Sequence, residues 1–412
     1  MGKTGLFTLT SGLHSEVIPD VSEEGFIREI AAAGADFDFC GEDFSRYGSH
    51  DAEVIYVRTG GTENAFKAVF PQLEGPVRLL TSGASNSLAA SMEILSFLRQ
   101  QGREGEILHG SAEYIAERIA ALVRAARARR RLLGSRAGVV GRPSDWLIAS
   151  DPDRAAVREK LGIELVDIPM EELVTEIRKG LCEAPSGFPL KSVRYSVNRK
   201  VTQKVFDGAL EIYGALKRLI DRYGLSAVTV RCFDLLSAVG NTGCIALALL
   251  NAEGVPSGCE GDIPTLLTMC VSNALFDVPG FMANPSRMDP LTGEMVFAHC
   301  TVPFSMLRDY AYDTHFESGI GVAVKGELPE GPVTLFKMAP GLDRCFTAEA
   351  GLVKNLSEKR LCRTQVLLRL DDRSLCRDYF LKDPIGNHHV IVPGRHAQEI
   401  RDFLEATASL NR

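Results

Sequence analysis

The chain has 412 residues, of which 45% are hydrophobic and 24% are charged, and its formal net charge is −7. This length is more than one hydrophobic core serves, so we expect two or three domains. The composition is typical of a globular protein, and the negative net charge gives no reason to expect nucleic acid or an anionic membrane as a partner.

The sequence predicts a cytoplasmic protein. Its N-terminal apolar run is too short for a signal peptide, and the chain has no apolar run of the length that spans a bilayer. The ten cysteines show no Cys-x-x-Cys pair and no zinc-type spacing. Several lie within apolar runs, which is typical of reduced, buried thiols.

Short apolar strands alternate with helix-length amphipathic segments through the first two thirds of the chain. This alternation predicts the α/β class, with parallel sheets in an N-terminal domain over residues 1–134 and in a second domain over 135–280. The runs EVIYVRTGG and PVRLLTSGASNS end in small polar residues, at the carboxyl ends of strands, where ligands of such sheets collect. Asn86 is therefore a candidate ligand contact as well as a helix cap.

Two residues of the second domain carry alternatives. Trp146, the one tryptophan of the chain, follows the strand-like run GVVG, and we interpret it as a core residue in preference to a sugar-stacking platform. Arg231 lies inside the apolar run AVTVRCF. Because an unpaired buried arginine is costly, it either pairs with a carboxylate or faces an anionic or hydroxyl-rich ligand.

Residues 281–412 show a different pattern. Apolar runs such as GIGVAVKG, PVTLFKMA and RTQVLLRL are separated by turns, which predicts a mostly antiparallel β domain, and the last amphipathic segment predicts a terminal helix. Gly386-Asn387 predicts a turn that brings His388 and His389 to the start of a strand. Adjacent strand residues face opposite sides, so at most one of the two histidines can join a given metal site.

The segment from Gly258 to Cys300 concentrates residues that carry chemistry. Glu260 stands between glycines after a strand-like run, and Pro264 lies in the first turn of the helix that follows. At such a corner the backbone can approach a ligand closely, and a carboxylate at a helix N-terminus is held ionised, which suits a metal ligand or a base. His299 follows in the strand-like run MVFAHC.

These motifs resemble those of the L-fucose isomerase and L-arabinose isomerase superfamily of metal-dependent aldose–ketose isomerases. The similarity is clearest in VRCFD, GCEGDIPTLLTM, FMANPS, AHCTVP and GNHH. The resemblance implies a subunit of two α/β domains and a β-rich C-terminal domain, assembled into homo-oligomers that are trimers or hexamers. It also implies a sugar substrate and a divalent ion, Mn²⁺ or Mg²⁺, at the domain junction.

The resemblance implies roles for single residues. Glu260 matches the acid that binds the metal and moves the proton, His389 matches the late metal-binding histidine, and His299 matches a histidine of the site. Asn284 stands where fucose isomerases have an aspartate, and its amide oxygen can bind a hard cation but cannot act as a base. Either Asp289, five residues later, supplies the second carboxylate, or the chemistry uses one acid and another proton carrier.

The chemistry accounts for these residue types. Converting an aldose to a ketose through an enediol moves one proton between C1 and C2 and builds negative charge on two adjacent oxygens. A hard divalent cation stabilises that charge, and a carboxylate carries the proton. The hypothesis is a Mn²⁺-dependent monosaccharide isomerase. Its predicted residues are catalytic Glu260 and Asp289; metal-binding Glu260, Asn284 and His389; and substrate-binding Arg231, Arg287, His299, His388 and Asn86.

Two alternatives stay open. One is an isomerase of the same fold for a sulfonated or phosphorylated hexose such as sulfoquinovose, which the arginines favour. The other is a non-catalytic sugar-binding protein. In an oligomer, Asn86 or His109 of a neighbouring subunit is a candidate contact to the site.

Overall fold

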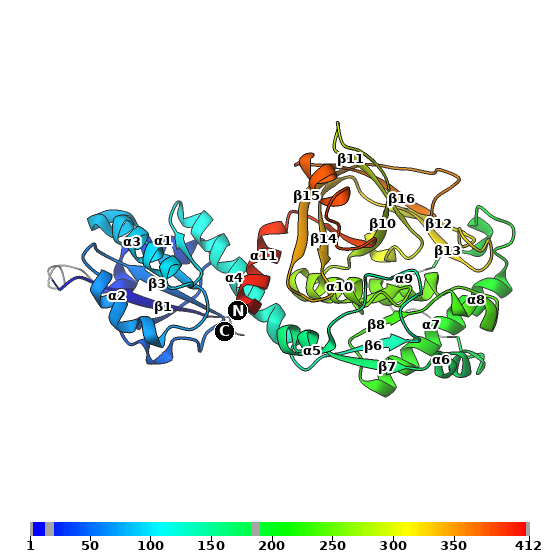
Figure 1. Cartoon of the computed structure of the whole chain (residues 1–412), viewed down its shortest axis with the longest axis horizontal. Coiled ribbons are helices and arrows are strands. Elements are labelled where there is room, and N and C mark those ends of the chain that lie inside the picture. The colour runs from blue at the N-terminus through cyan, green and yellow to red at the C-terminus, as the bar shows by residue number, and fades with distance from the viewer. Residues whose placement is uncertain (1–2, 13–19, 183–189, 409–412) are drawn as a thin grey trace. The chain divides into compact units, whose positions relative to one another are not determined.

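The computed structural model describes residues 3–12, 20–182 and 190–408 (Figure 1). They form two compact units: one contains the residues up to Arg130 together with those from Gln398 onward, and the other contains Arg131–Ala397. Each unit holds a parallel sheet, and the second unit also holds a closed antiparallel barrel. The predicted α/β class with an antiparallel β-rich C-terminal part is confirmed.

The first unit is built on a five-stranded parallel sheet with the order β2-β1-β3-β4-β5. Apolar side chains on both faces of the strands form two cores, one with α1 and α4 and the other with α2 and α3. Burial on both faces explains the mainly apolar runs of the inner strands β1, β3 and β4. The strands are β1 (Thr4–Leu9), β2 (Phe37–Gly41), β3 (Ala52–Val57), β4 (Val77–Leu80) and β5 (Gly105–Leu108), and the helices are α1 (Gly25–Ala32), α2 (Glu63–Val69), α3 (Ser87–Gln100), α4 (Ala112–Leu132) and α11 (Ala397–Ala408).

The C-terminal helix α11 belongs to the first unit. Arg118 of α4 donates hydrogen bonds to both carboxylate oxygens of Asp402, which is buried, and one of them is 2.7 Å long. The sequence places this helix in a domain of residues 281–412, whereas its buried ion pair joins it to α4. An amphipathic pattern predicts a helix but not the surface on which it packs. The three predicted domain boundaries stay predictions.

The second unit begins with a four-stranded parallel sheet in the order β7-β6-β8-β9. Strands β7 and β8 lie on opposite sides of β6, so the strand order reverses there, and ligands of open α/β sheets bind outside the carboxyl ends at such a point. The strands are β6 (Arg136–Val140), β7 (Glu164–Ile168), β8 (Ala227–Val230) and β9 (Ser257–Cys259), and the helices are α5 (Arg154–Ala156), α6 (Met170–Ile177), α7 (Gln203–Tyr223), α8 (Asp234–Val239), α9 (Cys244–Ala252) and α10 (Ile263–Phe276).

The barrel closes in the order β10-β11-β16-β15-β14-β17, and a separate hairpin, β12–β13, lies beside β16. Strands β10 and β17 are sequence-distant neighbours, and Ala283 is paired with His389 between them. The strands are β10 (Phe281–Asp289), β11 (Glu294–His299), β12 (Asp309–Asp313), β13 (Ala323–Glu327), β14 (Gly331–Met338), β15 (Cys345–Asn355), β16 (Thr364–Leu370) and β17 (His389–Pro393).

Helices α9 and α10 contact both the parallel sheet and strands of the C-terminal part. Almost all of their residues are buried, as expected for helices that are apolar on every side. One continuous core therefore runs from Val228 of the sheet through Leu247 of α9 to Leu335 and Val390 of the barrel. The parallel sheet and the barrel are held together by this shared core, and side chains from both can contribute to one site.

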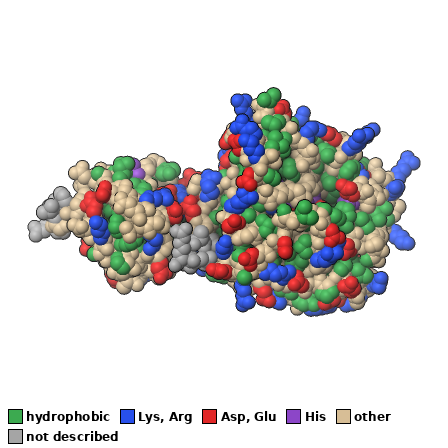
Figure 2. All heavy atoms as spheres, in the orientation of Figure 1, with side chains coloured by type: hydrophobic (Ala, Val, Ile, Leu, Met, Phe, Trp, Pro, Cys, Tyr) green, Lys and Arg blue, Asp and Glu red, His purple; other side chains and the backbone are tan. Residues whose placement is uncertain are grey.

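Among the helices of the described residues, none combines the length and the apolar character that crossing a membrane requires. Figure 2 shows acidic and basic side chains interspersed over the face that it draws, in keeping with the small net charge.

Candidate active site

Glu260 occupies the corner between β9 and α10, as the sequence predicts. The backbone φ of Glu260 is 62° and that of Gly261 is 71°, so two successive residues adopt the left-handed conformation. A Cβ on Gly261 would lie 2.6 Å from the carbonyl oxygen of Arg142, which explains the glycine. The left-handed conformation costs Glu260 about 1–3 kcal/mol, and such strain concentrates at functional sites. The corner is held because the Ser144 N–H donates to the Glu260 carbonyl at 2.9 Å.

Three buried side chains, Glu260, His299 and His388, point their ligand atoms toward one another. Glu260 Oε1 lies 3.9 Å from His299 Nε2 and 3.5 Å from His388 Nε2. One ligand atom from each residue lies within 4.8 Å of the others. They come from the β9–α10 corner, the end of β11 and the residue before β17, so the parallel sheet and the barrel both contribute to the group.

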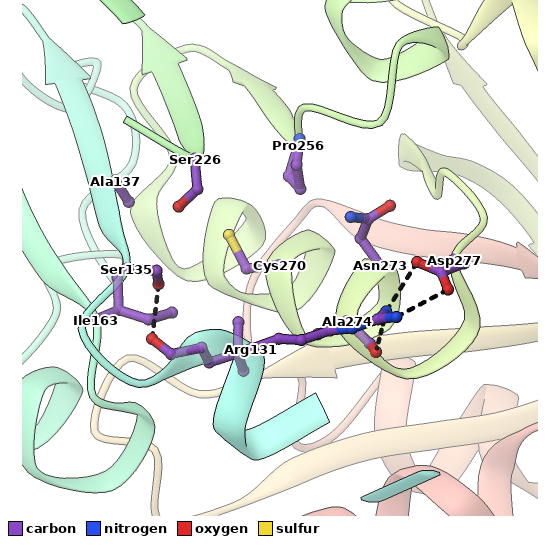
Figure 3. A pocket seen from close by; sticks show the side chains of 11 residues that line it. Arg131, Ser135, Ala137, Ile163, Ser226, Pro256, Cys270, Asn273, Ala274 and Asp277 are labelled. Atoms are coloured by element: carbon purple, nitrogen blue, oxygen red, sulfur yellow. Dashed lines mark hydrogen bonds and ion pairs between the residues drawn. The ribbon is translucent and has the colours of Figure 1, made fainter. Parts of the chain in front are cut away.

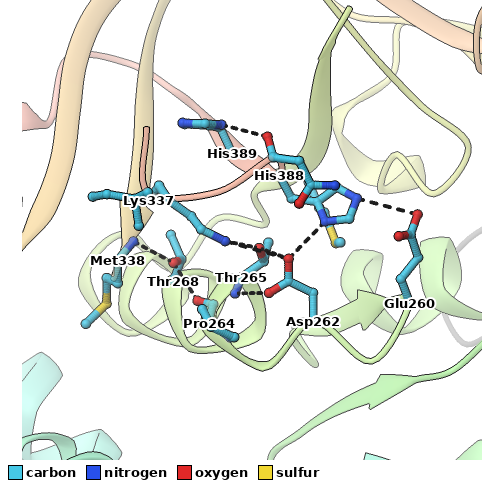
Figure 4. Close-up of polar contacts among 12 residues, drawn as sticks. Glu260, Asp262, Pro264, Thr265, Thr268, Lys337, Met338, His388 and His389 are labelled. Carbon is cyan, nitrogen blue, oxygen red and sulfur yellow. Dashed lines mark hydrogen bonds and ion pairs between the residues drawn. The ribbon is translucent and has the colours of Figure 1, made fainter. Parts of the chain in front are cut away.

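The histidine rings are oriented by partners on their other nitrogens. His388 Nδ1 donates to Asp262 Oδ2 at 2.9 Å (Figure 4). His299 Nδ1 lies 2.8 Å from Thr301 Oγ1. Each Nε2 is thereby turned to Glu260. Metal-binding histidines characteristically have such a partner on the second ring nitrogen.

The buried His388 Nε2 has no hydrogen-bond partner among the described residues. A buried polar atom without a hydrogen bond is costly, and a cation that takes the place of the Nε2 proton removes that cost. One carboxylate and two imidazoles are a donor set for a divalent cation such as Mn²⁺ or Zn²⁺. The residues present therefore fit a metal ion.

The charges in the group are set by its internal contacts. Burial raises the pKa of Glu260, but the nearby His299 and His388 rings bring it well below its ordinary value. Burial lowers the pKa of His388, but its hydrogen bond to Asp262 and the Glu260 carboxylate 3.5 Å away raise it to about 9. Glu260 is thus an ionised carboxylate at neutral pH, available as a ligand and as a proton acceptor.

Lys337 of β14 extends this group, and the sequence analysis missed it. Its ammonium is buried, donates to Thr265 Oγ1 at 2.6 Å and lies 3.6 Å from Asp262 Oδ2 (Figure 4). Asp262 caps α10 through the Thr265 N–H at 2.8 Å. Burial raises the pKa of Asp262, but the nearby Lys337 and His388 lower it by a larger amount, so the net shift is downward. The aspartate is therefore an anion that holds His388. The available signal was a single lysine in the apolar run PVTLFKMA.

We expect Lys337→Met to lower the free energy of unfolding by about 3–5 kcal/mol, because it leaves Asp262 as a buried carboxylate without its ammonium partner. Urea denaturation followed by circular dichroism measures the change. The matched control is Lys382→Met, since the Lys382 side chain is 64% exposed, and we expect an effect within about 0.5 kcal/mol. Equal stability of the two variants would show that the Lys337–Asp262 pair contributes nothing.

Trp146 is part of the site and not of the core. Its indole Nε1 donates to Glu260 Oε2 at 2.6 Å, and the residue is 50% exposed. Its ring meets Phe233 edge-on at 4.9 Å, and Phe233 meets His315 in the same way at 5.4 Å. The interpretation of Trp146 as a core residue is wrong, because the loop after β6 carries the ring to the carboxyl ends of the strands.

The two adjacent histidines have roles opposite to the predicted ones. His388 faces Glu260, whereas His389 faces the other side of the strand. His389 Nε2 lies 2.9 Å from Tyr379 OH, and His389 Nδ1 lies 2.9 Å from the Asn387 carbonyl oxygen. Aromatic rings surround His389, and burial lowers its pKa to about 3. The prediction of His389 as the metal ligand is corrected: strand alternation turns His388 toward the corner, and His389 is a neutral core residue.

Asp289 does not reach the group, so its prediction as the second acid is also corrected. It is exposed at the turn of the β10–β11 hairpin, where it is paired with Glu294 and accepts from the Leu291 N–H at 2.8 Å. Glu294 lies five residues before His299 on the same strand, which corresponds to about 17 Å at about 3.3 Å per residue. Strand β10 continues past Asn284 through a shift of register and carries Asp289 away from the site.

Asn284 and Arg287 lie along the same strand. Asn284 accepts a hydrogen bond from Asn387 at 3.2 Å, next to the turn that carries His388, and its role as a ligand stays a prediction. Arg287 pairs with Glu358 at 2.7 and 2.9 Å, and its side chain is 59% exposed. The structure does not bring Arg287 to Glu260.

Arg231, at the end of β8, pairs with carboxylates, which was one of its two predicted alternatives. It donates to Asp145 at 2.7 Å, to Asp234 at 3.0 Å and to the Pro143 carbonyl at 2.6 Å. These contacts fix the loop that carries Trp146. Arg231 therefore supports the site from outside the Glu260 group, and a direct contact with substrate stays a prediction.

Asn86 and His109 belong to the first unit. Asn86 precedes α3 with a φ of 59°, and its side chain makes no capping hydrogen bond within the described residues. His109 Nδ1 lies 2.9 Å from the Thr81 carbonyl oxygen. Their predicted contacts to the site of a neighbouring subunit stay predictions.

A separate hollow lies at the other end of the parallel sheet (Figure 3). Its lining includes Ser135, Ser226 and Pro256, which precede β6, β8 and β9. Arg131 bridges it to α10 by a bidentate pair with Asp277 at 2.8 and 3.2 Å. This hollow is at the amino ends of the strands, opposite to the end where Glu260 lies.

Parts of the chain are similar to proteins named sulfoquinovose isomerase. The chain is 28% identical over 136 residues to the protein from Clostridium sp. (strain MSTE9). The aligned region covers 32% of this chain and 29% of that protein. The chain is 22% identical over 278 residues to those from Priestia aryabhattai and Priestia megaterium, covering 65% of this chain and 61% of each relative. The match thus spans less than two thirds of each relative. No family model matches the chain.

Proposed function

We propose that this protein is a metal-dependent aldose–ketose isomerase that acts on a sulfonated hexose of the sulfoquinovose type. The observation that carries the proposal is the buried Glu260–His299–His388 group with its unpartnered His388 Nε2. The similarity to sulfoquinovose isomerases supports the reaction and the substrate class. Of the predicted metal ligands Glu260, Asn284 and His389, the group keeps Glu260; His388 and His299, both predicted as substrate contacts, take the other two places.

Glu260, His299 and His388 would hold the ion, and we propose Mn²⁺. When bound, it supplies positive charge against the negative charge that develops on the two adjacent substrate oxygens. Asp262 fixes the His388 tautomer and Thr301 contacts the other ring, so both Nε2 atoms face the ion without rearrangement. Lys337 keeps Asp262 ionised for this role.

Glu260 would move the proton. It is ionised and buried, and Trp146 fixes its rotamer through Oε2, so it can take the proton from one carbon and return it to the neighbouring carbon on the same face. With Asp289 away from the site, a single carboxylate serves both steps. This is the second of the two alternatives that the sequence leaves open.

Trp146 would form one wall of the substrate site. Half-exposed aromatic rings beside polar groups are typical of small-molecule sites, and this ring lies directly against the proposed base. The guanidinium groups of Arg142 and Arg231 flank the same loop and both contact Asp145, at 3.1 and 2.7 Å. Asp145 and Asp234 balance both charges, so the proposed preference for a sulfonated sugar rests on the similarity to sulfoquinovose isomerases.

An assay of ketose formation tests the proposed function. We expect the Mn²⁺-loaded chain to convert sulfoquinovose to the ketose. Glucose 6-phosphate, D-glucose and L-fucose should be converted at least about tenfold less efficiently, which corresponds to about 1.4 kcal/mol of selective binding. Removal of the metal by a chelator should stop the reaction, and Mn²⁺ should restore it. Binding of a sugar without conversion would identify a sugar-binding protein instead. A homo-oligomer of three or six subunits and a cytoplasmic location stay predictions.

A further inference from the structure

A second group of metal-ligating side chains, Asp38, Cys40 and His50, lies in the first unit, and the proposed reaction does not use it. Asp38 and Cys40 are two positions apart on the edge strand β2, where the pairing with β1 shifts register and leaves Cys40 as the extra residue. His50 comes from the loop before β3. One ligand atom from each residue lies within 4.8 Å of the others.

The spacing of the group is that of a tetrahedral zinc site. His50 Nε2 lies 3.1 Å from Asp38 Oδ2 and 3.9 Å from Cys40 Sγ. With zinc bonds of about 2.3 Å to sulfur and about 2.0–2.2 Å to nitrogen and oxygen, tetrahedral angles place these atoms about 3.4 and about 3.6 Å apart. Both observed separations differ from these values by about 0.3 Å. Closure around an ion therefore needs only small side-chain movements.

His50 is held with its Nε2 toward the group. Its Nδ1 lies 3.0 and 3.1 Å from the two Glu53 carboxylate oxygens, and the backbone N–H groups of Gly48 and His50 fix Glu53 at 2.8 and 2.9 Å. A carboxylate on the far nitrogen is the usual partner of a metal-binding histidine. With a proton on Nδ1 directed at Glu53, the ring would offer the Nε2 lone pair to an ion.

Gly5 of the neighbouring strand β1 makes room for this pair. A Cβ at this position would lie 2.2 Å from Glu53 Oε2 and 2.5 Å from His50 Nδ1. A side chain there would displace both residues. The Glu53–His50 pair is therefore built into the sheet and is not a chance surface contact.

Arg46 supplies positive charge to the group in this structure. Its guanidinium donates to Asp38 at 2.5 Å and lies 3.4 Å from His50 Nε2, so it would compete with a bound cation. The Arg46 side chain is 52% exposed. It can turn into solvent when an ion with two charges takes over the neutralisation of Asp38 and displaces the proton of the Cys40 thiol.

We propose that Asp38, Cys40 and His50 bind Zn²⁺, with solvent as the fourth ligand. A thiolate and an imidazole select Zn²⁺ over the harder Mn²⁺. The ion would tie the edge strand β2 to the loop before β3. This inference does not depend on the proposed isomerase function, because it uses residues of the other unit and a different ion.

Co²⁺ titration of the full, metal-stripped chain tests the proposal, since Co²⁺ gives a thiolate charge-transfer absorption only when a cysteine binds it. We expect the absorption to rise to saturation, to be lost in Cys40→Ser and to be bleached by Zn²⁺. The control variant Cys182→Ser, which changes an exposed thiol outside the group, should keep it. The variant His388→Asn should keep it as well. Failure of the wild-type chain to show the absorption, or its persistence in Cys40→Ser, would overturn the proposal.

Two further variants keep all three ligands and test the proposal if Cys40→Ser does not fold. Glu53→Gln should weaken Zn²⁺ binding by about 10- to 100-fold, because it removes the charge that orients His50. Arg46→Gln should tighten Zn²⁺ binding, because it removes the competing cation. Zn²⁺ affinities that are unchanged in both variants, measured by competition with a chromophoric chelator, would exclude the site.

Discussion

Glu260→Gln is expected to lower kcat for aldose–ketose conversion by about 10²- to 10⁴-fold, the usual contribution of a positioned acid–base group. The amide keeps the shape of the side chain and can still accept the hydrogen bond from Trp146, but it cannot take up a proton. Initial rates of ketose formation at saturating Mn²⁺ measure the effect, and circular dichroism verifies the fold.

Asp289→Asn is the matched control for Glu260→Gln. The sequence predicts Asp289 as a second acid, whereas the structure places it, exposed, at the hairpin turn. We expect kcat within about twofold of wild type, because the exposed side chain lies outside the site. The fold should be retained as well, since surface substitutions usually change stability by less than about 0.5 kcal/mol. A loss comparable to that of Glu260→Gln would place Asp289 in the reaction and refute the single-carboxylate mechanism.

His388→Asn and His389→Phe are expected to separate metal binding from packing. Loss of His388 removes a ligand, and we expect Mn²⁺ affinity to fall by more than about 100-fold, the upper range for loss of a partner behind a ligand. His389→Phe places one more ring in the aromatic cluster of Phe346 and Phe380 and should leave Mn²⁺ affinity unchanged. Isothermal titration of the metal-stripped variants with Mn²⁺ measures both.

The reverse outcome has a clear meaning. If His389→Phe lost Mn²⁺ and His388→Asn retained it, the ring facing Glu260 would not be a ligand, and the site built on the 3.5 Å approach of His388 to Glu260 would be wrong. Thermal unfolding of both variants shows whether either change acts through stability alone.

The sequence predicted the fold class because its signals are local. Apolar runs that alternate with amphipathic segments specify parallel sheets, and runs divided by turns specify the barrel. The place of α11 was not predictable in this way. Its amphipathic pattern can pack against any apolar surface. The Arg118–Asp402 contact that joins α11 to α4 links positions 284 residues apart.

The site was partly predictable for the same reason. Glu260 stands at a corner that Gly261 and Pro264 mark in the sequence, and alternation correctly puts His388 and His389 on opposite faces. Which face meets Glu260 depends on how β17 pairs with β10, and this is not written in the local sequence.

Asp289 was misplaced because Pro285 interrupts the pattern of a strand. A proline inside an apolar run usually marks a strand's end. Here a shift of register between Pro285 and Arg287 accommodates the ring, and β10 continues to Asp289. A bulge of this kind is visible only in the paired structure.

The ligand set has a consequence for how the protein matures during its synthesis. His388 and the Asp262 that holds it are 126 positions apart, and β17 begins directly after His388. A nascent chain in which this segment has not yet been synthesised carries Glu260 and His299 but lacks His388. Binding of an ion by all three proposed ligands therefore requires that β17 has been made and has paired with β10 and β14.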